Sequence, residues 1–205
     1  RGLPEMVSQF GAPITTYSMN RVLTGIGDAY VNAYAVIGYA GSLFASLMYG
    51  LSGGLQPLYG QSYGAKDDRG LRYYLKSGLT MSILGGLVLF GLTFFIGRPV
   101  CTIFGADAAA VNIVVQALPK YCLNFVFAAT SAVLASYLFS TKRTQYAIPL
   151  NICRSIVLNF CCINFLPVRF GAQFVWYAVA VAEAVCLCIA VVLWRVSERC
   201  GIVYR

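Results

Sequence analysis

Two charged residues, Arg154 and Glu183, stand inside apolar stretches of the sequence, where a charge is costly unless it is paired. A carboxylate in such surroundings can take up a proton or bind a monovalent cation, and a nearby guanidinium changes how readily it does so. At about 1.5 Å per helical residue, their expected depths differ by about 6 Å, which an arginine side chain can span. We therefore expect an ion pair, direct or bridged by water. Two roles stay open: a structural pair that fixes two helices, and a transport role in which Glu183 titrates or binds a cation.

The composition indicates that helices in a membrane position these two residues. Hydrophobic residues make up 59% of the chain and charged residues 11%, whereas about a quarter of the residues of an ordinary soluble domain are charged. Apolar runs of about 20 residues predict membrane-spanning helices. Six such helices are expected, at residues 4–26, 29–55, 73–97, 110–140, 146–168 and 173–195. The expected fold class is an all-α integral membrane protein with one domain, residues 1–205.

Prolines and a capping residue predict where some of these helices begin, bend or end. Asp107 closes an expected external connection, residues 98–107, and is a favourable N-cap for a long fourth helix beginning at Ala108. Pro119 predicts a kink in that helix. Pro13 predicts a break in the middle of the first helix.

Six spans place the connecting loops alternately on two sides of the membrane, and the basic residues divide unequally between them. One side receives Arg1, Lys66, Arg69, Arg72, Lys76, Lys142, Arg143, Arg195, Arg199 and Arg205. The other receives Arg21, Arg98, Lys120 and Arg169. By the positive-inside rule, both termini are expected in the cytoplasm. The sequence starts at Arg1 and is expected to be part of a longer protein.

Small and polar residues recur at spacings of three and four along three of the expected helices. The stripes are Gln9, Pro13, Thr16 and Asn20 in the first; Asn32, Ala35, Tyr39, Ser42, Ser46, Gly50 and Gly53 in the second; Asn124, Ala128, Ser131 and Ala135 in the fourth. One such stripe alone is typical of a helix-packing seam. Three together favour a polar cavity, because polar side chains in a bilayer avoid lipid. The candidate pathway residues are Gln9, Thr16, Asn20, Asn32, Tyr39, Asn124 and Ser131, with Glu183 and Arg154.

The second apolar run ends in a glycine-rich segment directly before a burst of charge. It reads Gly50-Leu-Ser-Gly-Gly-Leu-Gln-Pro-Leu-Tyr-Gly-Gln-Ser-Tyr-Gly-Ala-Lys66. Its glycines and Pro57 predict that the helix unwinds and turns along the membrane surface, as a rigid cytoplasmic turn in preference to a hinge. The residues that define this corner are Gly50, Gly53, Gly54, Gln56, Pro57, Gly60 and Gly64.

The corner, taken with Asn20-Arg21-Val-Leu, Gly27-Asp28-Ala29 and Asn32-Ala-Tyr-Ala-Val-Ile-Gly, resembles the second half of multidrug and toxic compound extrusion (MATE) transporters. Its Gly-Leu-x-x-Gly-x-x-Pro and Gly-Ala-Lys elements are the specific part. The resemblance continues through residues 92–104, the Arg154 segment and residues 171–183, and so covers essentially the whole chain. One departure concerns the fourth helix, where some members of the family carry an acidic residue. This chain has neutral groups there: Asn124, Thr130 and Ser131.

The resemblance implies one lobe of a twelve-helix, pseudo-symmetric transporter, with the missing N-terminal lobe as partner. It also implies export of cationic or amphipathic drugs or metabolites across the plasma membrane by alternating access. A sodium ion or proton would be exchanged, and no other cofactor is implied. The departure in the fourth helix leaves open whether the coupling-ion site is in this lobe or the missing one.

Two other functions stay open, one within transport and one outside it. A lipid-linked oligosaccharide or polysaccharide flippase of the same superfamily would need a larger and more basic cavity. A non-transporting scaffold is the other, because alternating access ordinarily needs two repeats.

Enzymatic, metal and nucleic-acid functions are disfavoured. The sequence has no histidine, no paired carboxylates in a span and no Gly-x-Ser-x-Gly, so no catalytic residue is proposed. A zinc site has few ligands to build from, since most cysteines lie in apolar runs. The net charge of +8 is spread between apolar runs, unlike the basic face of a nucleic-acid binder.

Overall fold

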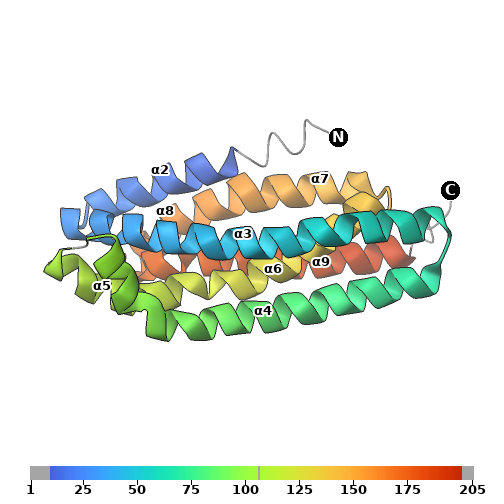
Figure 1. Cartoon of the computed structure of the whole chain (residues 1–205). Helices are drawn as coiled ribbons and strands as arrows, with labels where there is room; N and C mark the ends of the chain where they lie inside the picture. The colour runs from blue at the N-terminus through green and yellow to red at the C-terminus, as the bar shows by residue number, and fades with distance from the viewer. Residues whose placement is uncertain (1–9, 106, 200–205) are drawn as a thin grey trace.

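Long helices lying side by side form the whole of the structure that is described, in a computed structural model covering residues 10–105 and 107–199 (Figure 1). The helices are α2 (Gly11–Thr24), α3 (Asp28–Gly64), α4 (Asp68–Ile103), α5 (Ala108–Cys122), α6 (Asn124–Ser140), α7 (Thr144–Ile152), α8 (Asn159–Phe170) and α9 (Val175–Arg199). A π-helical segment, η1 (Cys153–Leu158), joins α7 to α8, and a 3₁₀ turn, η2 (Ala172–Phe174), precedes α9. The expected all-α class is confirmed.

Five helical stretches of the described chain are long and apolar enough to cross a membrane. They are Asp28–Gly64, Asp68–Ile103, Ala110–Ser140, Thr144–Phe170 and Ala172–Glu198. They correspond to the second to sixth expected spans. Of the first expected span only α2 is described, and Gln9 lies outside the described residues. Pro13 stands in the first described turn of α2, where proline is tolerated, and the helix then runs without a break to Thr24.

The predicted unwinding of the glycine-rich corner is wrong. Helix α3 continues as an α-helix through Pro57 to Gly64. The turn comes only at Lys66, which has φ 55°. Glycine inside a helix costs about 1 kcal/mol, but an unsatisfied backbone group in a bilayer costs several. The environment therefore keeps the segment helical against its local preference.

The connection expected at residues 98–107 is also shorter than predicted, because α4 includes Pro99 and runs to Ile103. Helix α5 begins at Ala108 as predicted, although the Asp107 side chain forms no capping hydrogen bond. The kink expected at Pro119 stays a prediction: the chain is interrupted only at Leu123, between α5 and α6, and Leu123 keeps helical backbone angles (φ -54°, ψ -26°).

Helix α6 is the central helix of the lobe. It packs against α3, α4 and α9, and residues 129–138 are all buried. Two apolar clusters surround it. One contains Phe125 and the start of α9, and the other contains Val133 and the later part of α9. The residues between the clusters, at Ser131 on α6 and Glu183 on α9, form a buried polar layer.

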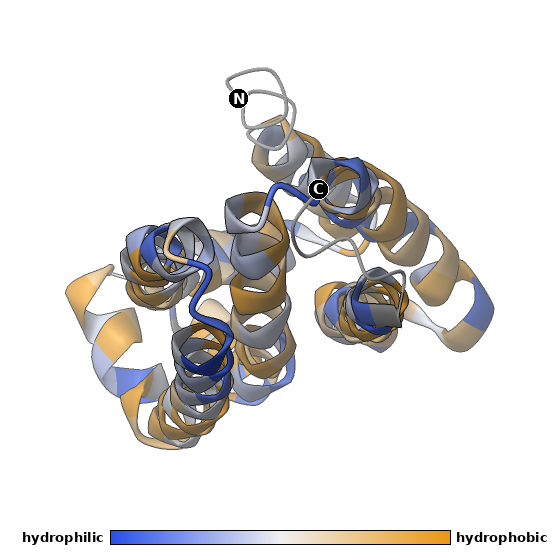
Figure 2. Cartoon of the chain, turned by 90° about the vertical axis from the view of Figure 1, so that its right-hand side faces the viewer, coloured by the Kyte–Doolittle hydropathy of each residue, from blue (hydrophilic) through white to orange (hydrophobic). Residues whose placement is uncertain are grey.

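Two turns at the same end of the lobe share one geometry. Lys66 and Lys142 have φ 55° and 58°. In each turn the next amide closes the helix end: the Asp67 N–H donates to the Ser62 carbonyl at 2.9 Å and the Arg143 N–H to Leu138 at 3.0 Å. Both turns lie at the right-hand end in Figure 1, which Figure 2 views directly, with hydrophilic segments in blue. The expected gathering of these basic loops at one end is confirmed.

Candidate functional site

Arg154 and Glu183 form the predicted ion pair. The Arg154 Nε donates to Glu183 Oε1 at 3.0 Å, and both residues are buried, with 8% and 7% exposure. They come from η1 and α9, which belong to the fifth and sixth expected spans. The sequence therefore located both members of a buried ion pair.

Two further helices complete the surroundings of the pair. On α6, the Ser131 hydroxyl donates to Glu183 Oε2 at 3.4 Å, and the Ala128 carbonyl accepts from Arg154 Nη2 at 3.3 Å. On α3, the Tyr49 ring centroid lies 5.9 Å from the guanidinium carbon, within cation–π distance. Both carboxylate oxygens of Glu183 thus have partners within the lobe.

Arg154 lies in the π-helical segment η1, whose geometry affects the hydrogen bonds of the Arg154 backbone. Its widened turn leaves the Arg154 carbonyl accessible, and the Asn159 side-chain amide donates to it at 3.1 Å. Helix α2 approaches this segment closely at Gly11, where an added Cβ would lie 2.5 Å from the Ser155 Cβ. The absence of a side chain at Gly11 therefore permits the contact between α2 and η1.

The stripe on α6 belongs to the interior of the lobe. Asn124 and Ser131 are both buried, at 5% and 1% exposure. Ser131 contacts the ion pair, whereas the Asn124 Oδ1 has no hydrogen-bond partner among the described residues. This stripe is thus a helix-packing seam, and one of its residues, Ser131, donates a hydrogen bond to the ion pair.

The stripe on α3 has the opposite environment. Its residues are all exposed on the lobe: Asn32, Ala35, Tyr39, Ser42, Ser46, Gly50 and Gly53. A Cβ added at Gly50, Gly53, Gly54, Gly60 or Gly64 would meet no atom within 4 Å. Within the described lobe these glycines therefore mark no close approach of another helix. On α2, Thr16 is exposed and Asn20 half-buried, so the structure joins neither to the ion pair.

The corner contributes to packing through residues on both sides of its glycines. Exposed Gln56 donates from Nε2 to the Ser136 hydroxyl at 3.4 Å, and exposed Pro57 lies in the helix interior. The stronger link was missed: the hydroxyls of Ser52 and Ser136 lie 2.7 Å apart, buried between α3 and α6. Ser52 lies next to the exposed stripe but on another face of the helix, so the stripe gave no signal for it.

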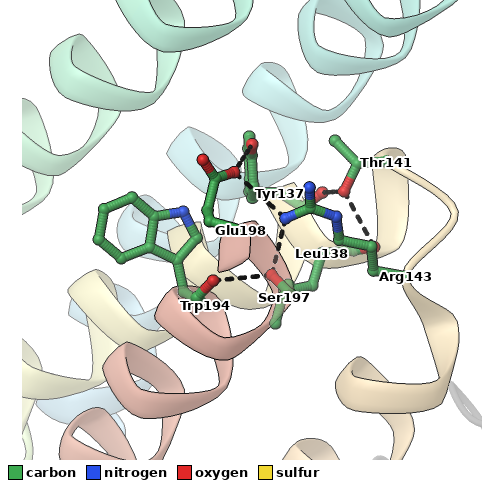
Figure 3. A network of polar contacts seen from close by, with 7 residues as sticks. All are labelled: Tyr137, Leu138, Thr141, Arg143, Trp194, Ser197 and Glu198. Carbon is green, nitrogen blue, oxygen red and sulfur yellow. Dashed lines mark hydrogen bonds and ion pairs between the residues drawn. The ribbon is translucent and has the colours of Figure 1, made fainter. Parts of the chain in front are cut away.

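A second ion pair, also missed, lies at the end of the lobe that carries the two lysine turns (Figure 3). Arg143 Nη1 lies 3.2 Å from Glu198 Oε1 and donates to the Ser197 hydroxyl at 2.7 Å. The Tyr137 hydroxyl donates to the same carboxylate oxygen at 3.0 Å. The sequence placed Arg143 in a loop and gave no partner for it.

Comparison with known proteins identifies the family. The sequence profile of the family described as MatE matches residues 4–164. Proteins named "Probable multidrug resistance protein NorM", from Listeria innocua and Listeria monocytogenes, are each 24% identical over 195 residues. Each match covers 91% of this chain and 43% of the relative.

Solved structures share the fold at low sequence identity. A crystal structure of a MATE protein in complex with MaL6 matches with a TM-score of 0.87 and 16% identity, over 98% of this chain and 46% of that one. A MOP superfamily transporter from Pyrococcus furiosus matches with a TM-score of 0.86 and 16% identity, over 100% of this chain and 46% of that one. The chain therefore spans less than half the length of these proteins. By the profile match, which covers most of its length, the chain belongs to the MatE family of multidrug and toxic compound extrusion transporters.

Proposed function

We propose that this chain is one lobe of a secondary active exporter that moves cationic or amphipathic small molecules in exchange for protons or sodium ions. The observation that carries the proposal is the family match over residues 4–164, joined with relatives named as probable multidrug resistance proteins. Members of this family are membrane transporters, which accords with a role other than catalysis.

We propose that a second, N-terminal lobe faces the exposed stripe of α3 and completes a twelve-helix, pseudo-symmetric transporter. The chain covers 43% of its NorM relatives, which leaves room for such a lobe. Asn32, Ser42 and Ser46 are exposed on a helix of bilayer length. Polar side chains on a spanning helix are stable beside water or another protein surface and costlier beside lipid, and the cost is smaller for Ser42 and Ser46, whose hydroxyls donate to the Tyr39 and Ser42 carbonyls at 2.8 Å. The stripe is thus a candidate wall of the substrate pathway.

The composition of this wall favours an exporter of cationic or amphipathic molecules over a flippase for anionic lipid-linked sugars. No charged residue occurs between Asp28 and Lys66. A pathway for an anionic headgroup would need basic residues along it. The proposed cargo, in contrast, can bind a neutral, polar and aromatic surface.

We propose a structural role for the Arg154–Glu183 pair, with the coupling cation bound in the other lobe. Both oxygens of Glu183 already have partners, Arg154 at 3.0 Å and Ser131 at 3.4 Å. A cation would have to displace the guanidinium before it could bind. A change of the coupling stoichiometry or ion in a Glu183→Gln variant that folds normally would contradict this role.

The proposed location is the plasma membrane, with both termini in the cytoplasm. The turns at Lys66 and Lys142 then face the cytoplasm, in keeping with the positive-inside rule. Labelling of a cysteine introduced at Asp67 by a membrane-impermeant reagent added outside intact cells would overturn this orientation.

Efflux of a cationic dye from cells producing the full-length protein tests the exporter proposal. Ser46→Trp adds bulk to the exposed stripe of α3 and is expected to reduce efflux about tenfold or more, because it narrows the pathway. Val88→Trp, at a 62% exposed apolar position of α4, is the matched control and should leave efflux unchanged. The exporter proposal fails if the unmodified protein extrudes no dye under either a proton or a sodium gradient.

A further inference from the structure

A small pocket lies at the end of the lobe opposite the two lysine turns, between α3, α5 and α9 (α5 is at the left in Figure 1). Its volume is about 60 Å³, which is room for a few water molecules or one small polar group. The polar part of its lining consists of Tyr30 of α3, Gln116 and Lys120 of α5, Gln173 of η2 and Trp176 of α9. Neither the transport pathway nor the ion pairs use these residues.

Each of these five side chains can donate a hydrogen bond, and none of the residues lining the pocket is acidic. Lys120 belongs to neither the Arg154–Glu183 nor the Arg143–Glu198 pair, and its Nζ lies 5.9 Å from the centroid of the Tyr177 ring. Trp176 is 4% exposed, and its indole N–H donates no hydrogen bond to any described residue. The pocket thus offers a positive charge and several donors and contains no carboxylate, and the two glutamine amides and the Tyr30 hydroxyl can turn their donors toward a bound group, which suits an anion.

The start of α9 adds to this preference. The helix begins at Val175, beside Gln173 and Trp176, and is 25 residues long. The Val175 N–H already donates to the Ala172 carbonyl of η2, so the helix contributes the positive end of its dipole next to the pocket and not a free Val175 N–H. Lys120 and the helix end act on the same small volume.

Lysine and tryptophan are common near membrane surfaces, but their usual roles there do not explain the positions of Lys120 and Trp176. An interfacial lysine extends into water and a belt tryptophan lies among lipid headgroups. Here Lys120 is half-buried, and Trp176 is buried among protein atoms. Both residues line the pocket instead.

We propose that this pocket, termed the Lys120 pocket, binds one phosphate group, supplied by a phospholipid headgroup or by a free phosphate. A phosphate presents several acceptor oxygens in a compact tetrahedron and so matches several converging donors better than a carboxylate does. The pocket lies where the helices end, at the level of the lipid headgroups in a spanning protein. The inference goes beyond the proposed export function and does not depend on its direction or cargo.

Thermal unfolding of the delipidated full-length protein in detergent tests the proposal. The probes are inorganic phosphate, phosphatidylglycerol and, as a lipid without phosphate, diacylglycerol, all at constant ionic strength. Phosphatidylglycerol is expected to raise the unfolding temperature in a saturable manner, and diacylglycerol is not. If inorganic phosphate also stabilises the protein, a free phosphate is sufficient; if only phosphatidylglycerol does, the lipid is the source.

Variants connect the effect to the pocket. Lys120→Met should weaken the apparent affinity for the phosphate probe about tenfold or more, and Lys120→Arg should largely restore it. Arg169→Met removes an exposed charge at the same end of the lobe, outside the pocket, and should bind as the unmodified protein does. Gln173→Leu changes an exposed side chain and should weaken binding of the phosphate probe severalfold. It tests the pocket independently if Lys120→Met does not fold. The proposal is overturned if no phosphate probe stabilises the protein, or if the Lys120 and Gln173 variants bind unchanged.

Discussion

The Arg154–Glu183 and Arg143–Glu198 ion pairs have the same three-part construction at different places along the helices. Each joins an arginine of the α7–η1 region to a glutamate of α9, and each carboxylate accepts a hydrogen bond from a side chain of α6, Ser131 or Tyr137. In the deep pair, the Arg154 and Glu183 side chains are 10% and 8% exposed. In the pair at the helix end, Arg143 is 4% exposed and Glu198 is 34% exposed.

The difference in exposure determines what each pair can tolerate. Glu198 reaches water, so solvent can replace part of its interaction with Arg143. Arg143 itself also donates to Ser197 and lies at the C-terminal end of α9, where a positive charge is stabilised by the helix dipole. If either Arg154 or Glu183 is removed, the other is left as a buried charge: Arg154 keeps only the uncharged Ala128 carbonyl and the Tyr49 ring, and Glu183 keeps only the Ser131 hydroxyl. The deep pair should therefore respond to mutation as a unit, and the pair at the helix end should not.

The largest expected effect comes from breaking the deep pair on one side. Glu183→Gln leaves Arg154 buried without its counter-charge and should lower the free energy of unfolding by about 3–5 kcal/mol. The double variant with Arg154→Met should lose less than Glu183→Gln alone, because no charge is stranded. Denaturation of the purified variants in detergent measures both losses. Equal losses in the single and double variants would refute the pairing.

A smaller effect is expected where α2 supports the deep pair. Gly11→Ala places a Cβ 2.5 Å from the Ser155 Cβ and 2.6 Å from its carbonyl oxygen, and neither atom belongs to a flexible side-chain end. We expect a loss of about 1–3 kcal/mol as α2 or η1 shifts. Gly91→Ala, on α4 and outside the α3 stripe, is the matched control: its Cβ meets nothing within 4 Å in the lobe, so stability should be unchanged or increase by up to about 1 kcal/mol. Equal unfolding temperatures for both alanine variants would show that the contact at Gly11 is not tight.

The smallest effect is expected for Glu198→Gln, at the pair near the helix end. Its carboxylate is 34% exposed, so we expect a loss of about 1 kcal/mol or less. Part of that loss should disappear at high salt, whereas the loss caused by Glu183→Gln should be nearly independent of salt. Unfolding temperatures of both variants at low and high ionic strength make the comparison. A salt-independent loss of several kcal/mol at Glu198 would show that the two pairs do not differ in this respect.

Sequence reasoning succeeded where a feature depends on one dimension, the position along the membrane normal. The apolar runs defined the class and the five long helical stretches, and simple depth arithmetic paired Arg154 with Glu183. It failed at the glycine-rich corner because the local preference of glycine and proline is weaker than the need to satisfy backbone groups in a bilayer. The helix therefore continued to Gly64, and the turn formed at Lys66.

The sequence by itself determined that the chain forms long membrane-type helices, which loops share an end, and which two buried charges meet. Only the tertiary structure decided which stripe faces outward. The α3 and α6 stripes look alike in sequence, yet Asn32 and Ser46 are exposed while Asn124 and Ser131 are buried. It also decided that Arg143, from a turn, meets Glu198, and that Lys120 and Trp176 line one pocket. The physical reason is that periodicity gives the face on which a side chain lies, whereas the neighbour of that face depends on how helices distant in sequence pack around α6.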